Sequence, residues 1–245
     1  MIIMKKKVLV ITHAASEGAG TLEEFLKYCG ASIKAVKLYE DERLPAVAQR
    51  YDAIISLGGP MNVHEEDKYP FLRKEAEFLE QAIESNIPIL GICLGAQMIA
   101  RVCGARVVKA SGQELGWKNV FVTDAGKRDI LFQGLPDVMK VFQWHEDTFE
   151  IPHGGLLLAT ANGCPNQGFR YGNAYGLQFH VEITSDILME WFNGKPELHE
   201  YIDIYRGIER DFFTQAKMIY SNFMWLVDLC CQSSKTRVNR LIKTS

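Results

Sequence analysis

Hydrophobic and polar positions along the first hundred residues alternate in blocks that predict strands and helices in turn. Apolar runs at 8–11, 53–57 and 87–90 are typical of strands buried on both faces of a sheet, and a further strand is expected at 33–38. Apolar residues also recur at helical spacing, as at 71–83. This alternation predicts an α/β fold with a doubly wound, mostly parallel sheet and helices on both faces.

Beyond residue 102 the pattern changes to short apolar runs that are separated by Gly, Asn and Pro. These runs predict strands at 105–109, 116–123, 139–143, 155–160 and 168–179. Helical spacing is sparse in this region. We therefore expect the second half of the sheet to contain antiparallel strands or a β-rich flap.

The C-terminal fifty residues have a helical pattern. Apolar residues within 198–229 form an approximate stripe, which we expect to pack on the main domain rather than on a partner, and Gly207 is expected to divide it into two helices. Lys and Arg accumulate after Asp228, in a tail that we expect to be solvated rather than bound to an acidic partner. The predicted division is a domain at 1–195 and a C-terminal helical extension with a basic tail at 196–245.

A cysteine flanked by glycines, in Gly91-Ile92-Cys93-Leu94-Gly95-Ala96-Gln97, joins the strand at 87–90 to a predicted helix at 94–102. This is the arrangement of a Gly-x-nucleophile-x-Gly elbow, in which a β-carbon on either glycine would clash at the bend. The helix N-terminus would favour the thiolate of Cys93. The alternative is a buried structural cysteine at an ordinary strand–helix turn.

A cysteine nucleophile needs a base and a third group that orients the base. His180 is the best candidate among the six histidines, because strand alternation in 178–182 would place His180 and Glu182 on the same face. The alternative for this segment is a strand with a solvated polar face. His145 is the competing base, but its acidic neighbours are sequential and suit a loop better.

Composition and charge exclude several classes of function. The 245 residues are 47% hydrophobic, enough for one sizeable core, and the net charge of -3 provides no basic field for nucleic acid. The six cysteines show no CxxC pair, no disulfide framework and no metal-ligand spacing, so we expect no metal site. The first loop lacks GxGxxG, and no cofactor is expected. Without a signal peptide or a membrane-length apolar run, the protein is expected to be cytoplasmic.

Three motifs together resemble the class I (triad) glutamine amidotransferases. They are the elbow at 91–97, the segment 178–182 and Gly58-Gly59-Pro60, which ends the strand at 53–57. Met61-Asn62-Val63 and the segment 143–149 are most similar to the stand-alone, GMP-synthase-like members. The resemblance covers roughly the first four-fifths of the chain and implies the flavodoxin-like fold of that family.

The resemblance also implies a mechanism. Cys93 would attack the side-chain amide carbon of glutamine and form a γ-glutamyl thioester. His180 would carry the protons, and Glu182 would fix the imidazole tautomer. The backbone N–H groups of Gly59 and Leu94 would form the oxyanion hole.

Contacts to the substrate are expected from Gly58, Gln97, Gln143 and Trp144. Gln97 lies one helical turn after Cys93, and its amide can both donate and accept. In the family, backbone groups at the strand end that matches Gln143 and Trp144 hold the amino-acid end of glutamine.

Three functions remain open. The favoured one is a glutaminase that releases ammonia for an unidentified acceptor enzyme, such as a synthetase subunit, because the chain has no ATP-binding Ser-Gly-Gly-x-Asp loop. The second is a γ-glutamyl peptidase that uses the same triad. The third is a non-catalytic regulatory or binding module, which the intact Cys93, His180 and Glu182 disfavour.

Overall fold

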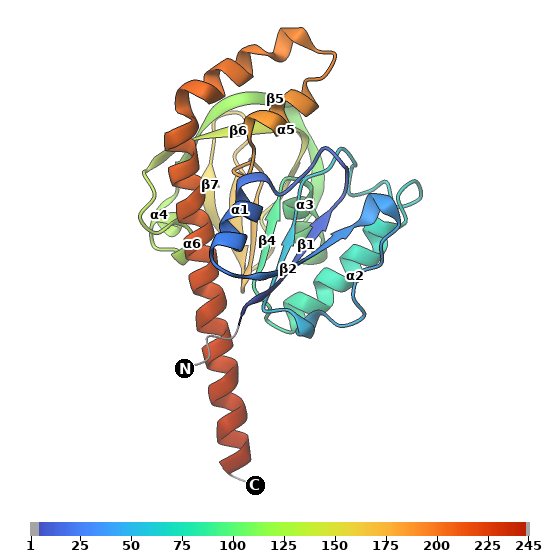
Figure 1. The fold of residues 1–245 in the computed structure, drawn as a ribbon, viewed down its shortest axis with the longest axis vertical. Helices are drawn as coiled ribbons and strands as arrows, with labels where there is room; N and C mark the ends of the chain where they lie inside the picture. The colour runs from blue at the N-terminus through green and yellow to red at the C-terminus, as the bar shows by residue number, and fades with distance from the viewer. Residues whose placement is uncertain (1–4, 244–245) are drawn as a thin grey trace.

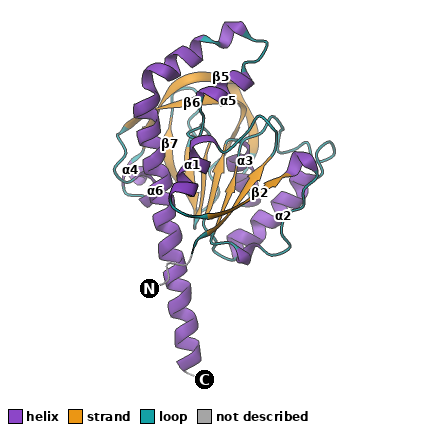
Figure 2. Cartoon of the chain, viewed as in Figure 1, coloured by secondary structure: helices purple, strands orange, loops and turns teal. Residues whose placement is uncertain are grey.

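The computed structural model describes residues 5–243 and the side chains of residues 5–233. Residues 1–4, where no signal peptide is expected, and the basic side chains after residue 233 lie outside this description. The centre of the molecule is a mixed nine-stranded sheet with the order β2-β1-β3-β4-β9-β8-β7-β5-β6 (Figures 1 and 2). Its strands are β1 (Lys7–Thr12), β2 (Ser32–Lys37), β3 (Ala53–Ser56), β4 (Ile89–Ile92), β5 (Val107–Val122), β6 (Val138–Phe149), β7 (Leu156–Thr160), β8 (Gly168–Tyr171) and β9 (Ala174–Leu177). The helices are α1 (Gly20–Tyr28), α2 (Phe71–Glu84), α3 (Leu94–Val102), α4 (Asp124–Lys127), α5 (Ser185–Trp191) and α6 (Glu200–Lys243).

Strands β2, β1, β3, β4 and β9 run parallel and form the doubly wound half of the sheet. The side chains of successive residues in β1 point to opposite faces of the sheet. Val8 and Val10 pack with residues of α1 and α6, whereas Leu9 and Ile11 pack with residues of α2 and α3. Both faces are therefore covered by helices, which explains the unbroken apolar runs and confirms the predicted α/β architecture.

The second half of the sheet is antiparallel, as predicted, but its strands are longer and differently divided. The runs at 105–109 and 116–123 belong to one strand, β5, whose pairing with β6 is irregular between Lys109 and Glu114. The run at 168–179 is a hairpin of β8 and β9. Strand β9 pairs antiparallel with β8 and parallel with β4, so it joins the two halves.

Helix α6 is one continuous helix of 44 residues. Gly207 does not divide it, and a β-carbon at this exposed position would meet nothing within 4 Å. Its buried residues include Ala216, Ile219, Tyr220 and Phe223, which pack in the same core cluster as residues of α1. The expectation that this stripe packs on the chain's own sheet is confirmed, and Figure 1 shows α6 continuing past the sheet.

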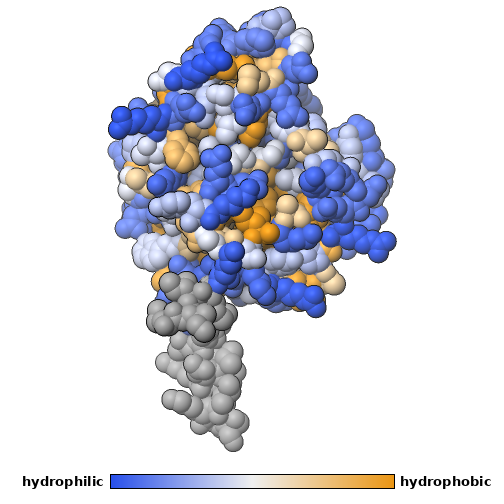
Figure 3. Space-filling view, viewed as in Figure 1, coloured by the Kyte–Doolittle hydropathy of each residue, from blue (hydrophilic) through white to orange (hydrophobic). Residues whose placement is uncertain are grey.

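Polar side chains cover most of the face seen in Figure 3, apart from a small apolar patch near its centre. Exposed large apolar side chains come from different elements, among them Tyr28 of α1, Met189 of α5 and Trp225 of α6. None of the helices within the described residues combines the length and apolar character that crossing a membrane requires.

Candidate active site

Cys93 occupies a strained turn between β4 and α3. Its backbone has φ 51° and ψ -106°, a conformation that few residues other than glycine adopt, and its N–H donates to the carbonyl oxygen of Leu177 (2.8 Å). A β-carbon on Gly95 would lie 2.1 Å from the backbone oxygen of Ser56, and one on Gly91 would lie 2.5 Å from the backbone of Gly95. The structure thus places the cysteine on a tight bend that both glycines make possible.

The thiol of Cys93 is mostly buried (7% of the residue is exposed) but forms part of a cavity wall. Its Sγ lies 3.9 Å from the carbonyl oxygen of Trp144, and Nε2 of Gln178 donates to it at 3.7 Å. Burial lowers the pKa of His180, but the charge of Glu182 and the contact with the thiol outweigh it, so this pKa lies well above its ordinary value. Thiol and imidazole line the same cavity, and the thiol is among the groups that raise the pKa of His180.

The imidazole of His180 is held by Glu182, although not for the predicted reason. Strand β9 ends at Leu177, and His180 follows in a bent segment that pairs with β6 only through an isolated bridge to Phe142. Nδ1 of His180 lies 2.6 Å from Oε1 of Glu182, and the N–H of Val181 donates to the other carboxylate oxygen (2.9 Å). A proton on Nδ1 leaves Nε2 as the ring nitrogen that can exchange a proton with the thiol.

Two helices hold the segment that carries this pair. The N–H of Thr21, in α1, donates to the carbonyl oxygen of Glu182 (2.9 Å). The hydroxyl of Tyr220, in α6, donates to the carbonyl oxygen of Val181 (2.8 Å). Because the segment has no strand ladder of its own, these contacts fix its course.

Glu17 and Trp191 also border the imidazole, and sequence reasoning missed both. The rings of Trp191 and His180 meet edge to face with centroids 5.0 Å apart. A β-carbon on Gly58 would lie 2.7 Å from Oε2 of Glu17 and 3.0 Å from Cε1 of His180. The sequence could have indicated Glu17 by its position, because Glu17 follows β1 and ligands of such sheets bind beyond the carboxyl ends of the parallel strands.

Gly59 and Leu94, the two expected oxyanion donors, lie next to each other, and Gly59 lines the cavity together with Cys93. A β-carbon on Gly59 would lie 2.8 Å from Cδ2 of Leu94. Among residues 5–243, neither of the two backbone N–H groups donates a hydrogen bond to another protein group. Neither group is therefore committed to an acceptor within this part of the protein.

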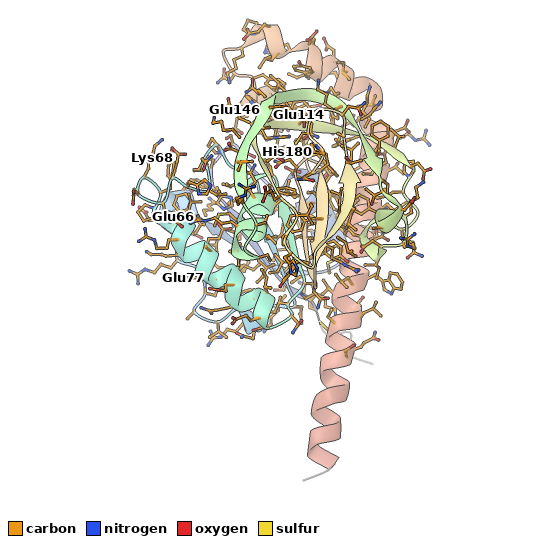
Figure 4. All side chains as sticks on the ribbon, turned by 180° about the vertical axis from the view of Figure 1, so that it is seen from behind. Glu66, Lys68, Glu77, Glu114, Glu146 and His180 are labelled. Atoms are coloured by element: carbon orange, nitrogen blue, oxygen red, sulfur yellow. The ribbon has the colours of Figure 1, made fainter. Side chains whose placement is uncertain are left out.

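The cavity has a volume of about 740 Å³, within the range of small-molecule sites. Cys93, His180, Gln97 and Trp144 contribute to its wall. Nε2 of Gln97 donates to the carbonyl oxygen of Asp147 and to Gln178, each at 3.2 Å. Figure 4 shows His180 beneath the curved β5–β6 ribbon.

Of the expected substrate contacts, Gln97 and Trp144 line the cavity, whereas Gly58 and Gln143 are not among its lining residues in the described part of the chain. The side chain of Gln143 is fully buried and donates to Gln167 (2.7 Å).

The family model for class-I glutamine amidotransferases (GATase) matches residues 19–189. This chain belongs to that family. The match includes the elbow, the Gly58-Gly59 turn and the His180–Glu182 pair.

Known amidotransferase relatives cover most of the chain. The glutamine amidotransferase-like protein YfeJ of Salmonella typhimurium is 32% identical over 182 residues, which are 73% of this chain and 76% of YfeJ. One subunit of the glutamine-hydrolyzing GMP synthase of Sulfolobus acidocaldarius is 33% identical over 64% of this chain and 80% of its own. The crystal structure of a glutamine amidotransferase from Thermotoga maritima superposes with a TM-score of 0.82 at 34% identity, covering 91% of this chain and 98% of that one. Other matched GMP synthases are longer, and the alignment covers only 24–30% of their length.

A second group of Cys, His and Glu lies beside the same amidotransferase cavity. The ligand atoms of Glu114, His145 and Cys164 lie within 4.8 Å of one another, and Nε2 of His145 is 3.1 Å from Oε2 of Glu114. His145 is in strand β6 and not in a loop as expected. These three side chains could together hold a cation such as Zn²⁺. No sequence pattern indicated the group, because its members are 31 and 19 positions apart.

Proposed function

We propose that this amidotransferase hydrolyses the side-chain amide of glutamine with Cys93 as the nucleophile, His180 as the base and Glu182 as the group that orients the base. The observation that carries the proposal is the strained elbow of Cys93 in the wall of the same cavity as the imidazole of His180, which Glu182 holds. Cys93 also lies at the N-terminus of α3, where the helix dipole favours a thiolate.

The proposed reaction begins when Nε2 of His180 takes the thiol proton and Sγ of Cys93 attacks the amide carbon. The N–H groups of Gly59 and Leu94 stabilise the resulting oxyanion, each by about 3 kcal/mol in the transition state. His180 then protonates the departing ammonia, which leaves a γ-glutamyl thioester. A water molecule activated by His180 hydrolyses the thioester, while Glu182 stabilises the charged imidazole.

Cys164 also lies close to a histidine and a glutamate, as Cys93 does, but it is less suited to be the nucleophile. Burial raises the pKa of its thiol, and the thiol hydrogen-bonds to Oγ1 of Thr148 (3.2 Å). It lies in the segment between β7 and β8 and not at the start of a helix, unlike Cys93. A thiol that resists ionisation is a poor nucleophile, which favours Cys93.

For the substrate, we propose contacts from the backbone at Gly58, the amide of Gln97 and the backbone groups of Gln143 and Trp144. The carbonyl oxygen of Trp144 is already close to Sγ of Cys93, so this strand can position the amino-acid end of glutamine near the thiol. The ammonia would pass to a separate synthetase, by analogy with the relative that is named as one subunit of GMP synthase.

Covalent trapping tests the assignment of the nucleophile. We expect a diazo-ketone analogue of glutamine to modify Cys93, as located by mass spectrometry of peptides, because this reagent alkylates the nucleophilic thiol. Ammonia release from glutamine should be lost in Cys93→Ala and retained in the matched variant Cys164→Ala. An adduct on Cys164, or substantial turnover by Cys93→Ala, would contradict the proposal. Faster cleavage of γ-glutamyl dipeptides than of glutamine would instead favour a peptidase.

A further inference from the structure

A buried chain of hydrogen bonds leads to the turn that carries the proposed oxyanion donor. His13, directly after β1, and Glu75, in α2, are both fully buried, with Nε2 of His13 2.7 Å from Oε2 of Glu75. The hydroxyl of Ser56 donates to the other oxygen of Glu75 (2.7 Å). On its opposite side, Nδ1 of His13 lies 3.0 Å from the carbonyl oxygen of Gly58.

The partners determine where the protons of His13 lie. A carbonyl oxygen only accepts, so Nδ1 carries a proton and donates to Gly58, and a proton on Nε2 is donated in a hydrogen bond to the carboxyl group of Glu75. Burial lowers the pKa of His13, but the charge of Glu75 and the hydrogen bonds to Glu75 and Gly58 outweigh it and raise this pKa above its ordinary value. The raised pKa favours the imidazolium form, in which the ring donates to the carboxyl group of Glu75 on one side and to a peptide oxygen on the other.

The same peptide unit joins the carbonyl of Gly58 to the N–H of Gly59. In a trans peptide these two groups point in opposite directions, so the hydrogen bond from His13 also fixes the direction of the Gly59 N–H. A hydrogen bond at the oxygen polarises the unit and makes the N–H a stronger donor. A charged donor has a larger effect than a neutral one.

We propose that His13 and Glu75 are positioning residues that strengthen the oxyanion hole by orienting and polarising the Gly58–Gly59 peptide. The inference rests on the proposed function, because the Gly59 N–H is its oxyanion donor. A buried pair of charges gives little net stability compared with apolar side chains of the same size. A contribution to the stability of the fold therefore does not explain well why His13 and Glu75 are buried at this position.

Glu75→Gln removes the charge and can keep every hydrogen bond. The hydroxyl of Ser56 can donate to the amide oxygen, the amide nitrogen can donate to Nε2 of a neutral His13, and Nδ1 can still donate to Gly58. We expect kcat for glutamine to fall about tenfold with KM unchanged within about twofold, because only transition-state stabilisation is lost. Alkylation of Cys93 by iodoacetamide forms no oxyanion, so its rate should not change.

Two further variants separate orientation from packing. His13→Asn can keep a donor for Gly58 and should resemble Glu75→Gln, whereas His13→Phe removes the donor and should lower kcat about a hundredfold. Phe71→Leu is the matched control, since its ring lies 6.3 Å from that of His13 and forms no hydrogen bond. An equal fall of kcat in Phe71→Leu would show that packing is responsible and would overturn the proposal.

Nuclear magnetic resonance of the protein without glutamine provides a readout that does not depend on catalysis. We expect both ring nitrogens of His13 to be protonated at pH 7.5, and the amide proton of Gly59 to shift upfield in Glu75→Gln but not in Phe71→Leu. A neutral His13 in the wild type, with no shift at Gly59 in Glu75→Gln, would overturn the proposal. The expected spectra without ammonia release by the wild type would uphold the polarised peptide and refute the glutaminase assignment.

Discussion

Glu17 places a carboxyl group that titrates near neutrality beside the imidazole of His180. Burial is the main reason that the pKa of Glu17 rises to about 7, and it outweighs the attraction of His180 and His13 for the carboxylate. The unfolded chain, in which this carboxyl group is solvated, has the ordinary value of 4.5. Folding therefore favours the protonated form of Glu17.

This shift predicts a pH-dependent stability difference between the wild type and Glu17→Gln. A group whose pKa is raised by folding contributes stability below its unfolded pKa and loses that contribution as the pH rises through its folded pKa. The variant should therefore equal the wild type at about pH 3.5, below the unfolded pKa, and exceed it by about 1–3 kcal/mol at about pH 8.5. Urea unfolding at both pH values measures the difference.

Glu77→Gln, at an exposed position of α2, is the matched control and should show no such difference. A constant gap between wild type and Glu17→Gln at the two pH values would mean that Glu17 does not titrate differently on folding.

At single positions, sequence reasoning found what a local pattern encodes and missed what only the fold brings together. The elbow of Cys93 is local, since its glycines lie two positions away on each side. His180 and Glu182 were paired from strand alternation that the structure does not contain, and their contact arises within a bent segment. His13 and Glu75 are 62 positions apart, and no local pattern could join them.

At the scale of helices and strands, the prediction made from Gly95 was confirmed and the one made from Gly207 was wrong, because glycine has a different role at the two positions. Gly95 lies where α3 crosses β3 so closely that a β-carbon would overlap the backbone of Ser56. Gly207 lies on the exposed side of α6 and meets nothing. A sequence shows that a glycine is present but not which of these reasons applies, and so the expected break in α6 was wrong.

Substitution of these two glycines by alanine should have opposite effects. Gly207→Ala should raise the free energy of unfolding by about 1 kcal/mol, because alanine loses less conformational freedom in a helix. Gly95→Ala should lower it by about 3 kcal/mol or more, because the added carbon would meet backbone that cannot move aside. Urea denaturation measures both. A destabilised Gly207→Ala would indicate a requirement for glycine in α6 that its surroundings do not show.

For the whole molecule, the C-terminal helix holds the segment that carries the proposed base, although the family match ends at residue 189. Tyr220 of α6 donates to the carbonyl oxygen of Val181, between the proposed base and its carboxylate partner. The same hydroxyl lies 3.0 Å from Oγ1 of Thr21 in α1. The alternation of strands and helices and the change to antiparallel strands were predictable, but this long-range contact was not. The division at 195/196 remains a prediction.

Tyr220→Phe should therefore weaken both the fold and the reaction. Loss of the hydroxyl leaves the buried carbonyl of Val181 without this donor, at a cost of about 1–2 kcal/mol. The kcat for glutamine should fall as well, because the neighbouring imidazole is held less firmly. Thermal unfolding and ammonia release measure the two effects.

Tyr205→Phe is the matched control, since its hydroxyl makes a longer hydrogen bond (3.4 Å) to Ile183. Equal losses in both variants would argue against a special role for Tyr220.

The pairing of β4 with β9 has a consequence for how the chain can vary. Ile92 of β4 lies opposite Leu177 of β9. Ile92 is one residue before Cys93, and Leu177 is three residues before His180. In the sequence, strands β5 to β8 are inserted between β4 and β9, which are neighbours in the sheet. Lengthening or shortening a turn within β5 to β8 that is far from β4 and β9 would leave Sγ of Cys93 and the imidazole of His180 in place. A slip of one residue along β4 and β9 would point the side chains of one strand to the wrong side and separate nucleophile from base.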